Sequence, residues 1–247
     1  MQFTIIGGTV LSSLDARPVQ DRTALARKSP IPETVSMLKV GLTGGIACGK
    51  STVLAMFAEL GAHTLRADEV AHRLMAPGEL VYERIVKAFG EQILARDGTI
   101  ARAKLAEAAF PARIKELNKI VHPAVLAFMD DWAREAAESD PAGVAICEAA
   151  LILEAGAVYD KLIVVTCTPE QKVSRFAQRT GMSIEAAREE VQRRMAAQIS
   201  EEEKVRLADY VVDNSGSKEN AEKKVREVWR QLEIESQRQT CSNTAGI

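Results

Sequence analysis

Short apolar runs alternate with amphipathic stretches along most of the chain. Where apolar residues run together we predict five strands, at about residues 38–43, 62–65, 143–147, 162–167 and 210–212. The third run is apolar on both faces, as expected of a parallel strand buried within a sheet. Strands that alternate with helices predict an α/β fold with a doubly wound, parallel five-stranded sheet flanked by helices.

Helical spacing of apolar residues fills the segments between these strands. The longest such segment, residues 66–139, exceeds what a crossover between parallel strands needs, so we expect a helical insert that recognises a substrate. Within it, Pro111 suits the first turn of a helix, whereas Pro123 should kink or interrupt one. The last predicted helix carries an apolar stripe that ends at Leu232.

The two ends of the sequence lack this periodicity. Residues 1–36 mix prolines and charges without a helical or strand period, and we expect a loosely ordered extension. Met37 directly precedes the first predicted strand, which suggests the hypothesis that translation starts there. Residues 236–247 are polar, and we expect a frayed tail.

A glycine-bounded loop joins the first predicted strand to the helix after it. Gly44 and Gly49 bracket four residues and are followed by Lys50 and Ser51, which fits the G-x-x-x-x-G-K-[ST] pattern of phosphate-binding loops. Glycines let the backbone N–H groups approach a phosphate, and the N-terminus of the next helix adds a positive dipole end. Lys50 can reach the β- and γ-phosphates of a nucleotide, and the Ser51 hydroxyl can ligate Mg²⁺. A turn that merely joins strand to helix is disfavoured, because the strand and helix that the motif requires are both predicted.

Asp68 and a pair of arginines are further candidates for chemistry. Asp68 follows the second predicted strand, at the sheet edge where ligands gather in open parallel sheets. There it can accept a proton or help to hold Mg²⁺, or it can simply cap the following helix. Arg175 and Arg179 lie one helical turn apart, where they can stabilise a transferring phosphoryl group or belong to a solvated helix face.

Composition and missing motifs exclude several classes of protein. The net charge of −2 and the aromatic content of 4% argue against a nucleic-acid surface, and no apolar run is long enough to predict a membrane span. The four cysteines form no C-x-x-C pair, which favours reduced thiols in a cytoplasmic protein, and the three histidines form no zinc pattern. No D-x-x-G follows the third predicted strand and no N-K-x-D follows the fourth, which disfavours a GTPase switch protein.

Several motifs taken together resemble the dephospho-coenzyme A kinase family of P-loop kinases. They are the loop sequence GLTGGIACGKST at residues 41–52, Ala67-Asp68, Asp97-Gly98-Thr99, His122-Pro123, the Arg175/Arg179 pair, Ala197-Gln198 and the Asp-Asn-Ser-Gly run at residues 213–216. The resemblance spans about residues 38–232 and implies transfer of the ATP γ-phosphoryl group to the ribose 3′-hydroxyl of dephospho-CoA. It also implies a nucleotide-binding core (37–65, 140–168 and 207–235), a helical CoA-substrate domain (66–139) and a lid (169–206).

Roles for individual residues follow from the same resemblance. It implies that Asp68, Lys50, Arg175 and Arg179 are catalytic and that Ser51 and Asp68 organise Mg²⁺. ATP would contact Gly45, Ile46, Ala47, Cys48, Gly49, Lys50, Ser51, Thr52, Asn214 and Gly216. Arg102, His72 and His122 fall on positions of the substrate domain, although His122 is as well explained as a structural histidine.

The sequence departs from the family pattern at four positions. Arg66 replaces the first acid of the usual Asp-Ala-Asp, which puts a role for that acid in doubt. His72 replaces an arginine, which would weaken a positive substrate contact or make it pH-dependent. Ala150 replaces a proline. Cys48 replaces a small residue and is either inert or an oxidisable thiol that would obstruct phosphate binding.

Other interpretations stay open on the sequence alone. A different small nucleoside or nucleotide kinase would share the loop and the arginines. A non-catalytic nucleotide-binding module, or a structural domain with a vestigial loop, would share only the loop. For the favoured interpretation we expect a cytoplasmic monomer or weak homo-oligomer that acts on a small molecule, without nucleic-acid or membrane partners.

Overall fold

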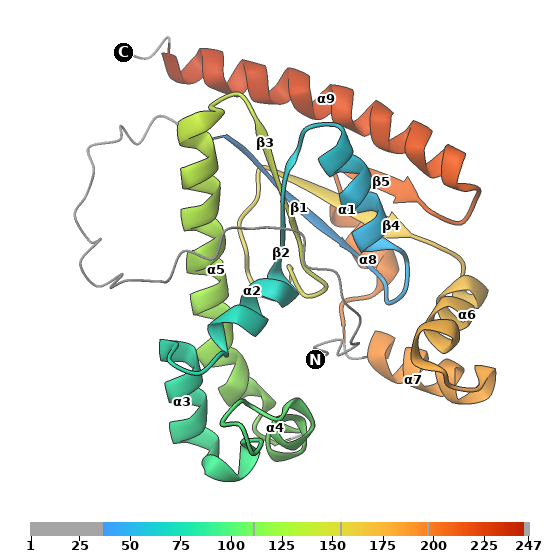
Figure 1. Ribbon diagram of the computed structural model, residues 1–247. Helices are drawn as coiled ribbons and strands as arrows, with labels where there is room; N and C mark the ends of the chain where they lie inside the picture. The colour runs from blue at the N-terminus through green and yellow to red at the C-terminus, as the bar shows by residue number, and fades with distance from the viewer. Residues whose placement is uncertain (1–36, 111, 154, 197, 245–247) are drawn as a thin grey trace.

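Figure 1 shows the computed structural model, which describes residues 37–110, 112–153, 155–196 and 198–244 of the 247-residue chain. The expected N-terminal extension and Pro111 therefore lie outside the described residues.

The described part of the chain is built around one parallel sheet of five strands. The strands are β1 (Leu38–Gly44), β2 (His63–Arg66), β3 (Val144–Glu148), β4 (Lys161–Thr166) and β5 (Tyr210–Asp213). Their order is β2-β3-β1-β4-β5, with every neighbouring pair parallel, which confirms the predicted fold class. From β1 the chain passes to the edge strand β2, returns to β3 beside β1, and then crosses to β4 and β5 on the other side of β1. The segment after β1 therefore lies at the point where the strand order reverses, which is where open α/β sheets bind ligands.

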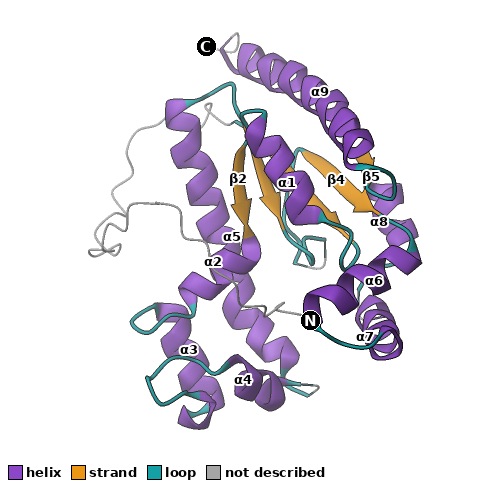
Figure 2. Ribbon diagram, turned by 45° about the vertical axis from the view of Figure 1, so that its right-hand side comes forward, coloured by secondary structure: helices purple, strands orange, loops and turns teal. Residues whose placement is uncertain are grey.

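Helices cover both faces of this sheet. On one face α1 (Lys50–Glu59) and α9 (Lys218–Thr244) lie side by side (Figures 1 and 2). Alternate strand residues such as Ile163 and Val165 pack against this pair. Their neighbours Leu162 and Val164 face the opposite side, where α5 (Ile114–Ser139) contacts β3 and α8 (Glu201–Leu207) contacts β4. Strand residues are thus apolar on both faces, as the sequence predicted for a buried parallel sheet.

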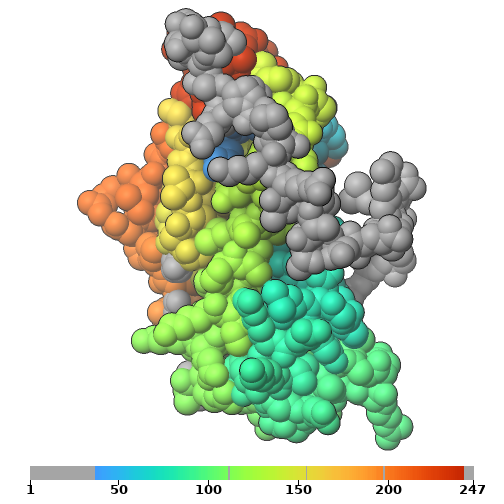
Figure 3. Space-filling view, turned by 90° about the vertical axis from the view of Figure 1, so that its left-hand side faces the viewer, coloured from blue at the N-terminus to red at the C-terminus, as the bar shows by residue number. Residues whose placement is uncertain are grey.

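A helical lobe extends from the carboxyl edge of the sheet. It contains α2 (Ala67–Leu74), α3 (Leu80–Phe89), the 3₁₀ turn η1 (Glu91–Ile93), α4 (Arg102–Ala109) and the first half of α5. The lobe has its own apolar cluster around Ile85, Phe89 and Leu117, and in Figure 3 it forms the end of the molecule opposite α9.

Helix α5 differs from the sequence prediction at Pro123, because the helix runs through this proline without a break. Its apolar stripe is buried on both sides of Pro123, at Leu117 and Val121 before it and at Val125 and Met129 after it. Packing along the whole helix therefore outweighs the one backbone hydrogen bond that the proline removes. The second half of α5 packs on the sheet through Ala133 and Ala137, so this helix belongs to both the lobe and the core.

A helical hairpin stands on the other side of the same sheet edge. It consists of α6 (Pro169–Thr180) and α7 (Ile184–Ala196) (Figures 1 and 2). A capping box fixes the start of α6, because the Thr168 hydroxyl accepts from the Gln171 backbone N–H and the Gln171 side chain accepts from that of Thr168. The capping box therefore fixes the point at which the chain passes from the end of β4 into α6.

The C-terminal segment corrects a prediction. We expected residues 236–247 to fray, but α9 continues to Thr244. Ser236 is 1% exposed, and its hydroxyl lies 2.8 and 2.9 Å from the carbonyl oxygens of Ala142 and Gly143. A polar residue at this place satisfies buried backbone groups of the turn before β3, so its polarity does not indicate a solvated end.

Candidate active site

A cavity of about 620 Å³ opens at the carboxyl edge of the sheet, between the helical lobe and the α6–α7 hairpin. It brings together the loop after β1, the ends of β2 and β3, and side chains from α4 and α6. The lining residues are Gly44, Ile46, Ala47, Gly49, Lys50, Ser51, Arg66, Asp68, Glu69, His72, Arg102, Glu148, Ala150, Arg175, Arg179 and Gln198.

The loop after β1, residues 44–51, has a backbone that the glycines make possible. Gly49 has φ +87°, and a Cβ there would collide with the Asn214 side-chain amide. A Cβ on Gly44 would collide with the Val165 carbonyl oxygen on β4. The Lys50 Nζ donates to the carbonyl oxygens of Gly44 and Gly45, at 3.2 and 2.9 Å. A glycine-dependent loop that ends at a helix N-terminus, with its lysine in the same cavity, fits the predicted phosphate site.

Of the three carboxylates that border this cavity, Asp68 and Glu148 act on the charge of the Lys50 ammonium. Asp68 lies in the first turn of α2, and Glu148 ends β3. Desolvation raises the pKa of both carboxyls, while the positive charges of Lys50 and Arg66 oppose the rise. Desolvation lowers the pKa of Lys50, and Glu148, Cys48 and Asp68 oppose that change. Because burial and opposite charges act together here, each group is a candidate for proton transfer or phosphate binding.

The position of Asp68 separates the two alternatives left open by the sequence. Helix α2 begins at Ala67, and its N-cap residue is Arg66, which makes no capping hydrogen bond through its side chain. Asp68 therefore stands inside the first turn rather than at the cap. Its carboxylate borders the cavity instead of closing the helix end.

Arg66 stands where the family pattern has an acid. Its guanidinium contacts two carboxylates beside Asp68, those of Glu69 and Glu148. Its Nε donates to Glu148 Oε2 at 3.2 Å, and its Nη1 donates to Glu69 Oε1 at 2.5 Å. The Glu148 side chain is only 13% exposed, so this contact supplies a countercharge in a partly desolvated place. Arg66 thereby orients Glu148 and adds a positive charge beside Asp68.

The two arginines of α6 reach the cavity in different ways. The Arg175 Nη2 donates to the Asn214 carbonyl oxygen at 3.0 Å, while its Nη1 is buried and has no hydrogen-bond partner among the described residues. Arg179 lies over the Phe176 ring, with 5.5 Å from Cζ to the ring centroid. Desolvation and the nearby Arg194 lower the pKa of Arg179. Arg175 borders the cavity and has one guanidinium nitrogen without a partner among the described residues, so it is suited to receive an anion.

The three residues expected to contact the acceptor do not all lie in the same place. Arg102 of α4 and His72 of α2 line the cavity and contact each other, through Arg102 Nη2 and His72 Nδ1. Desolvation and the Arg102 charge lower the pKa of His72. His122 lines a smaller apolar cavity of about 70 Å³ instead, which also touches Asp68 and Ala150. Burial lowers the pKa of His122.

The remaining predicted residues do not line the large cavity, and two of them, Cys48 and Asn214, contact each other at the loop. Cys48 is buried beneath it, and its carbonyl oxygen accepts from Asn214 Nδ2 at 2.8 Å. Asn214 thus links the loop to the turn after β5. Gly45 is buried in the loop, Thr52 is exposed on α1, and Gly216 is exposed in the turn before α9.

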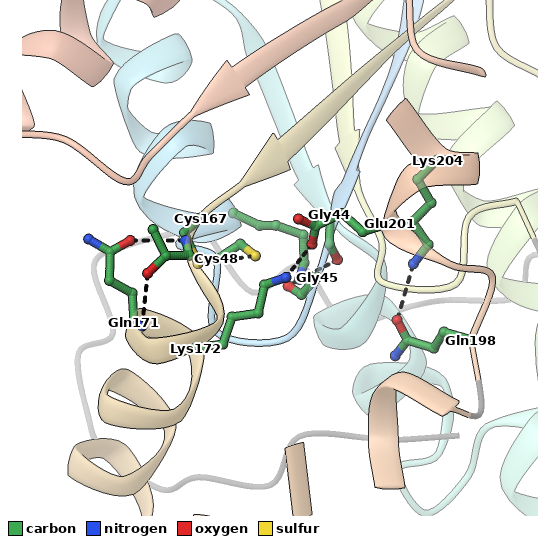
Figure 4. A network of polar contacts seen from close by, with 11 residues as sticks. Gly44, Gly45, Cys48, Cys167, Gln171, Lys172, Gln198, Glu201 and Lys204 are labelled. Atoms are coloured by element: carbon green, nitrogen blue, oxygen red, sulfur yellow. Dashed lines mark hydrogen bonds and ion pairs between the residues drawn. The ribbon is translucent and has the colours of Figure 1, made fainter. Parts of the chain in front are cut away.

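Sequence reasoning missed Glu148 and Gln198 as cavity residues. Glu148 carried a usable signal, because an acid directly follows a buried strand beside β1, which is the rule that selected Asp68. Gln198 was noted only within the family resemblance. In the structure it accepts at Oε1 from Lys204 Nζ at 3.1 Å (Figure 4).

The donors at the loop end of the cavity suit a hard cation. Ser51, Asp68 and Glu148 all border the cavity and all offer oxygen atoms, which Mg²⁺ prefers. Among the described residues, no group of three or more histidines, cysteines or acids is arranged to hold a metal ion.

Comparisons with known proteins agree on one family. The family described as Dephospho-CoA kinase matches residues 38–220. A Dephospho-CoA kinase of Aquifex aeolicus is 42% identical over 200 residues, which cover 79% of this chain and 98% of that protein.

Two solved structures are also similar. TT1252 from Thermus thermophilus has a TM-score of 0.65 and 31% identity, over 80% of this chain and 98% of that one. A dephospho-CoA kinase from Campylobacter jejuni has a TM-score of 0.51 and 25% identity, over 78% and 96%. Within the part of the chain that the structure describes, no helix is both long and apolar enough to cross a bilayer.

Proposed function

The chain belongs to the dephospho-CoA kinase family, which phosphorylates dephospho-CoA in the last step of coenzyme A synthesis, and we propose that the cavity beside β1 carries out this transfer from ATP to the ribose 3′-hydroxyl. One observation carries the proposal. A single cavity joins the phosphate loop, a carboxylate suited to be a base and two arginines, which are the parts that phosphoryl transfer needs.

The loop residues 44–51 hold the triphosphate of ATP in this proposal. Backbone N–H groups from Ala47 to Thr52 face the phosphates, and Lys50 leaves the carbonyls of Gly44 and Gly45 to reach the β- and γ-phosphates. Asn214 and Gly216 lie beside the adenine. The contact between Asn214 and the Cys48 carbonyl supports this assignment, because it joins the turn after β5 to the loop.

Asp68 accepts the proton of the 3′-hydroxyl as that oxygen attacks the γ-phosphorus. The bond from the γ-phosphorus to the bridging oxygen breaks, and ADP leaves. Desolvation raises the pKa of Asp68, which makes its carboxylate a better base, and the positive charges of Lys50 and Arg66 oppose that rise. Arg175 and Arg179 neutralise the charge on the equatorial oxygens, and the unpartnered Arg175 Nη1 is available for this contact.

Ser51 and Asp68 would hold Mg²⁺, with Glu148 close enough in the same cavity to assist. When bound, the ion neutralises phosphate charge during the transfer.

The helical lobe binds dephospho-CoA, and the α6–α7 hairpin acts as a lid that excludes water. Arg102 and His72 border the acceptor side of the cavity, and His122 borders the adjoining apolar cavity. The cavity lies between the lobe and the hairpin, and this position supports both roles. A lid that excludes water would also suppress ATP hydrolysis.

A coupled assay of ADP release tests the function directly. Dephospho-CoA, adenosine, AMP and shikimate are offered in parallel with ATP and Mg²⁺. We expect rapid ADP release with dephospho-CoA alone, and Lys50→Ala should abolish it without a large change in the thermal midpoint. Faster turnover of another acceptor would assign a different kinase, and turnover independent of any acceptor would overturn the transfer.

The three buried thiols support a reducing compartment such as the cytoplasm.

A further inference from the structure

Two cysteines far apart in the sequence meet beneath the phosphate loop. The Sγ atoms of Cys48 and Cys167 lie 3.4 Å apart (Figure 4). Cys48 is fully buried, and Cys167 is 6% exposed. Neither residue lines the proposed active-site cavity through its side chain, and the proposed transfer uses neither thiol.

The pair connects the parts of the site that handle phosphate. Cys48 belongs to the loop after β1, whereas Cys167 directly precedes Thr168, the N-cap residue of α6. The Cys48 carbonyl accepts from Asn214 Nδ2, and the Asn214 carbonyl accepts from Arg175. A covalent bond between the two sulfurs would therefore join the loop to the base of the helix that carries Arg175 and Arg179.

The surroundings give the two thiols different reactivity. The hydrogen bond with the Cys48 thiol and the positive charges of Arg175 and Lys172 lower the pKa of Cys167, against burial and the Glu201 charge. The contact with Cys167 and burial raise the pKa of Cys48. Cys167 is thus the better nucleophile of the pair, and Cys48 is placed to react second.

We propose that Cys48 and Cys167 form a reversible disulfide when the protein meets a small peroxide, and that this bond weakens the binding of the ATP triphosphate. The proposal rests on the phosphate-loop assignment in the proposed function.

The chemistry balances in two steps. The Cys167 thiolate attacks one peroxide oxygen, the O–O bond breaks, and a sulfenic acid forms with the release of hydroxide, which takes up a proton to give water. The Cys48 sulfur then attacks the Cys167 sulfur, the S–O bond breaks, and the second water leaves with the Cys48 proton. Two thiols lose two electrons, and hydrogen peroxide gains them.

A cavity lies near the pair. It is the third cavity of the site region, has a volume of about 240 Å³, and is bounded by Gly45, Glu201 and residues at the end of α7 and the start of α8. A Cβ built on Gly45 would lie 2.9 Å from Cys48 Sγ and 2.8 Å from Glu201 Oε2. The Cys48 sulfur therefore lies next to Gly45, which borders this cavity.

The bond would displace the loop that holds the phosphates. A disulfide needs its sulfurs about 2.05 Å apart, so Cys48 and Cys167 must approach by more than about 1 Å. The Cys48 peptide lies between Ala47 and Gly49, which both have positive φ, at 56° and 87°, so the loop has little freedom to absorb the shift. Misplacement of reacting groups by about 1 Å can cost about 10²-fold in rate.

The test compares reduced and peroxide-treated full-length protein in two measurements. Peptide mass mapping without reductant asks whether the peptides that contain Cys48 and Cys167 become linked. Calorimetric titration with ATP and Mg²⁺, without any acceptor, measures affinity. We expect the link to form, ATP affinity to fall by at least about tenfold, and both changes to reverse with dithiothreitol.

Two single substitutions make the test specific. Cys167→Ser should keep the affinity of the reduced protein and resist peroxide, whereas Cys241→Ser, which removes an exposed thiol on α9, should respond as the unsubstituted protein does. Equal peroxide sensitivity of Cys167→Ser, absence of the link, or a linked protein with unchanged ATP affinity would each overturn the proposal. If Cys167→Ser does not fold, the peptide map and titration of the unsubstituted protein still decide. Because the titration contains no dephospho-CoA, a wrong acceptor would leave this result intact.

Discussion

At the scale of single residues, the Asp68 carboxylate is the clearest test of the mechanism. Asp68→Asn keeps the shape of the side chain but removes the base, so we expect kcat to fall by about 10²–10⁴-fold. The Asp68 side chain does not cap α2 and borders the cavity, so the thermal midpoint should change little. Steady-state kinetics and a thermal melt measure both quantities, and near-normal turnover would refute the assignment.

Arg66 offers a second test, through the pH dependence of kcat. Desolvation raises the pKa of Asp68 and Glu148, and the Arg66 charge opposes the rise at both. Activity should therefore fall on acidification at a pH above the ordinary range of an aspartate. Arg66→Gln removes the opposing charge, so we expect the acidic limb of kcat to move to higher pH. Glu83→Gln, on the surface of α3, is the control, and an unmoved limb in Arg66→Gln would contradict the electrostatic role.

Asp68 and Glu148 also affect the free energy of unfolding, and the sign of that effect distinguishes an acidic loss of kcat from acid unfolding. Between the ordinary and the raised pKa, the folded state binds more protons at Asp68 and Glu148 than the unfolded chain does. These two groups therefore make folding less favourable as pH rises through that window, and more favourable as pH falls. An acidic loss of activity that they cause cannot come from their destabilising the fold.

The same residues show what sequence can and cannot reveal at this scale. Asp68 was predictable, because its place after a strand puts it at the ligand edge of the sheet. The partner of Arg66 was not, because Glu148 lies 82 positions away and only the pairing of β2 with β3 brings the two together. The Cys48–Cys167 contact depends in the same way on the neighbouring ends of β1 and β4.

At the scale of elements, one buried ion pair fastens the α6–α7 hairpin to the core. Lys172 of α6 is 2% exposed, and its Nζ lies 2.5 Å from Glu201 Oε2 at the start of α8 (Figure 4). Lys172→Met leaves the Glu201 carboxylate without this partner in a largely desolvated place. We expect a loss of about 3 kcal/mol in the free energy of unfolding, measured with urea.

A surface lysine supplies the matched control for that experiment. Lys218 pairs with Glu222 on α9, but its side chain is 73% exposed, so Lys218→Met should change stability little. The double variant Lys172→Met/Glu201→Leu should recover much of the loss, because no charge is then left unpaired. Equal stability of Lys172→Met and Lys218→Met would contradict the role of the buried pair.

The start or end of a helix was predictable where residues in the sequence mark it. It was not predictable where tertiary contacts determine how far the helix extends. Thr168 and Pro169 mark the start of α6 in the sequence, and the structure begins the helix there. The end of α9 carries no such mark. The polar residues from Ser236 onward predicted a frayed tail, whereas the Ser236 hydroxyl in fact bonds to the turn before β3.

At the scale of the whole molecule, the parallel sheet followed from alternating strands and helices, but the cleft did not. Periodicity predicted a helical insert between β2 and β3 and a charged helical region after β4. The periodicity did not predict how the insert and the helical region after β4 are oriented relative to each other. Their positions on opposite sides of one cavity depend on packing such as that of α5, which continues through Pro123 from the lobe onto the sheet.

This arrangement predicts that the two substrates bind cooperatively. Arg102 borders the cavity from the lobe, and Arg179 borders it from the hairpin. A triphosphate that draws Arg179 inward completes the wall around the acceptor, so each ligand should favour the closed arrangement that the other needs. We expect dephospho-CoA to bind at least about fivefold tighter when a non-hydrolysable ATP analogue is present.

Calorimetric titrations of dephospho-CoA, with and without the analogue, measure this coupling, and linkage requires the analogue to gain the same factor from dephospho-CoA. Arg179→Ala should reduce the coupling more than it reduces the affinity for dephospho-CoA alone. Arg188→Ala is the matched control, because Arg188 is exposed on α7 of the same hairpin and does not line the cavity. Equal dephospho-CoA affinity in both titrations would mean that the hairpin does not close over the acceptor. The proposed role of the α6–α7 hairpin as a lid would then be wrong.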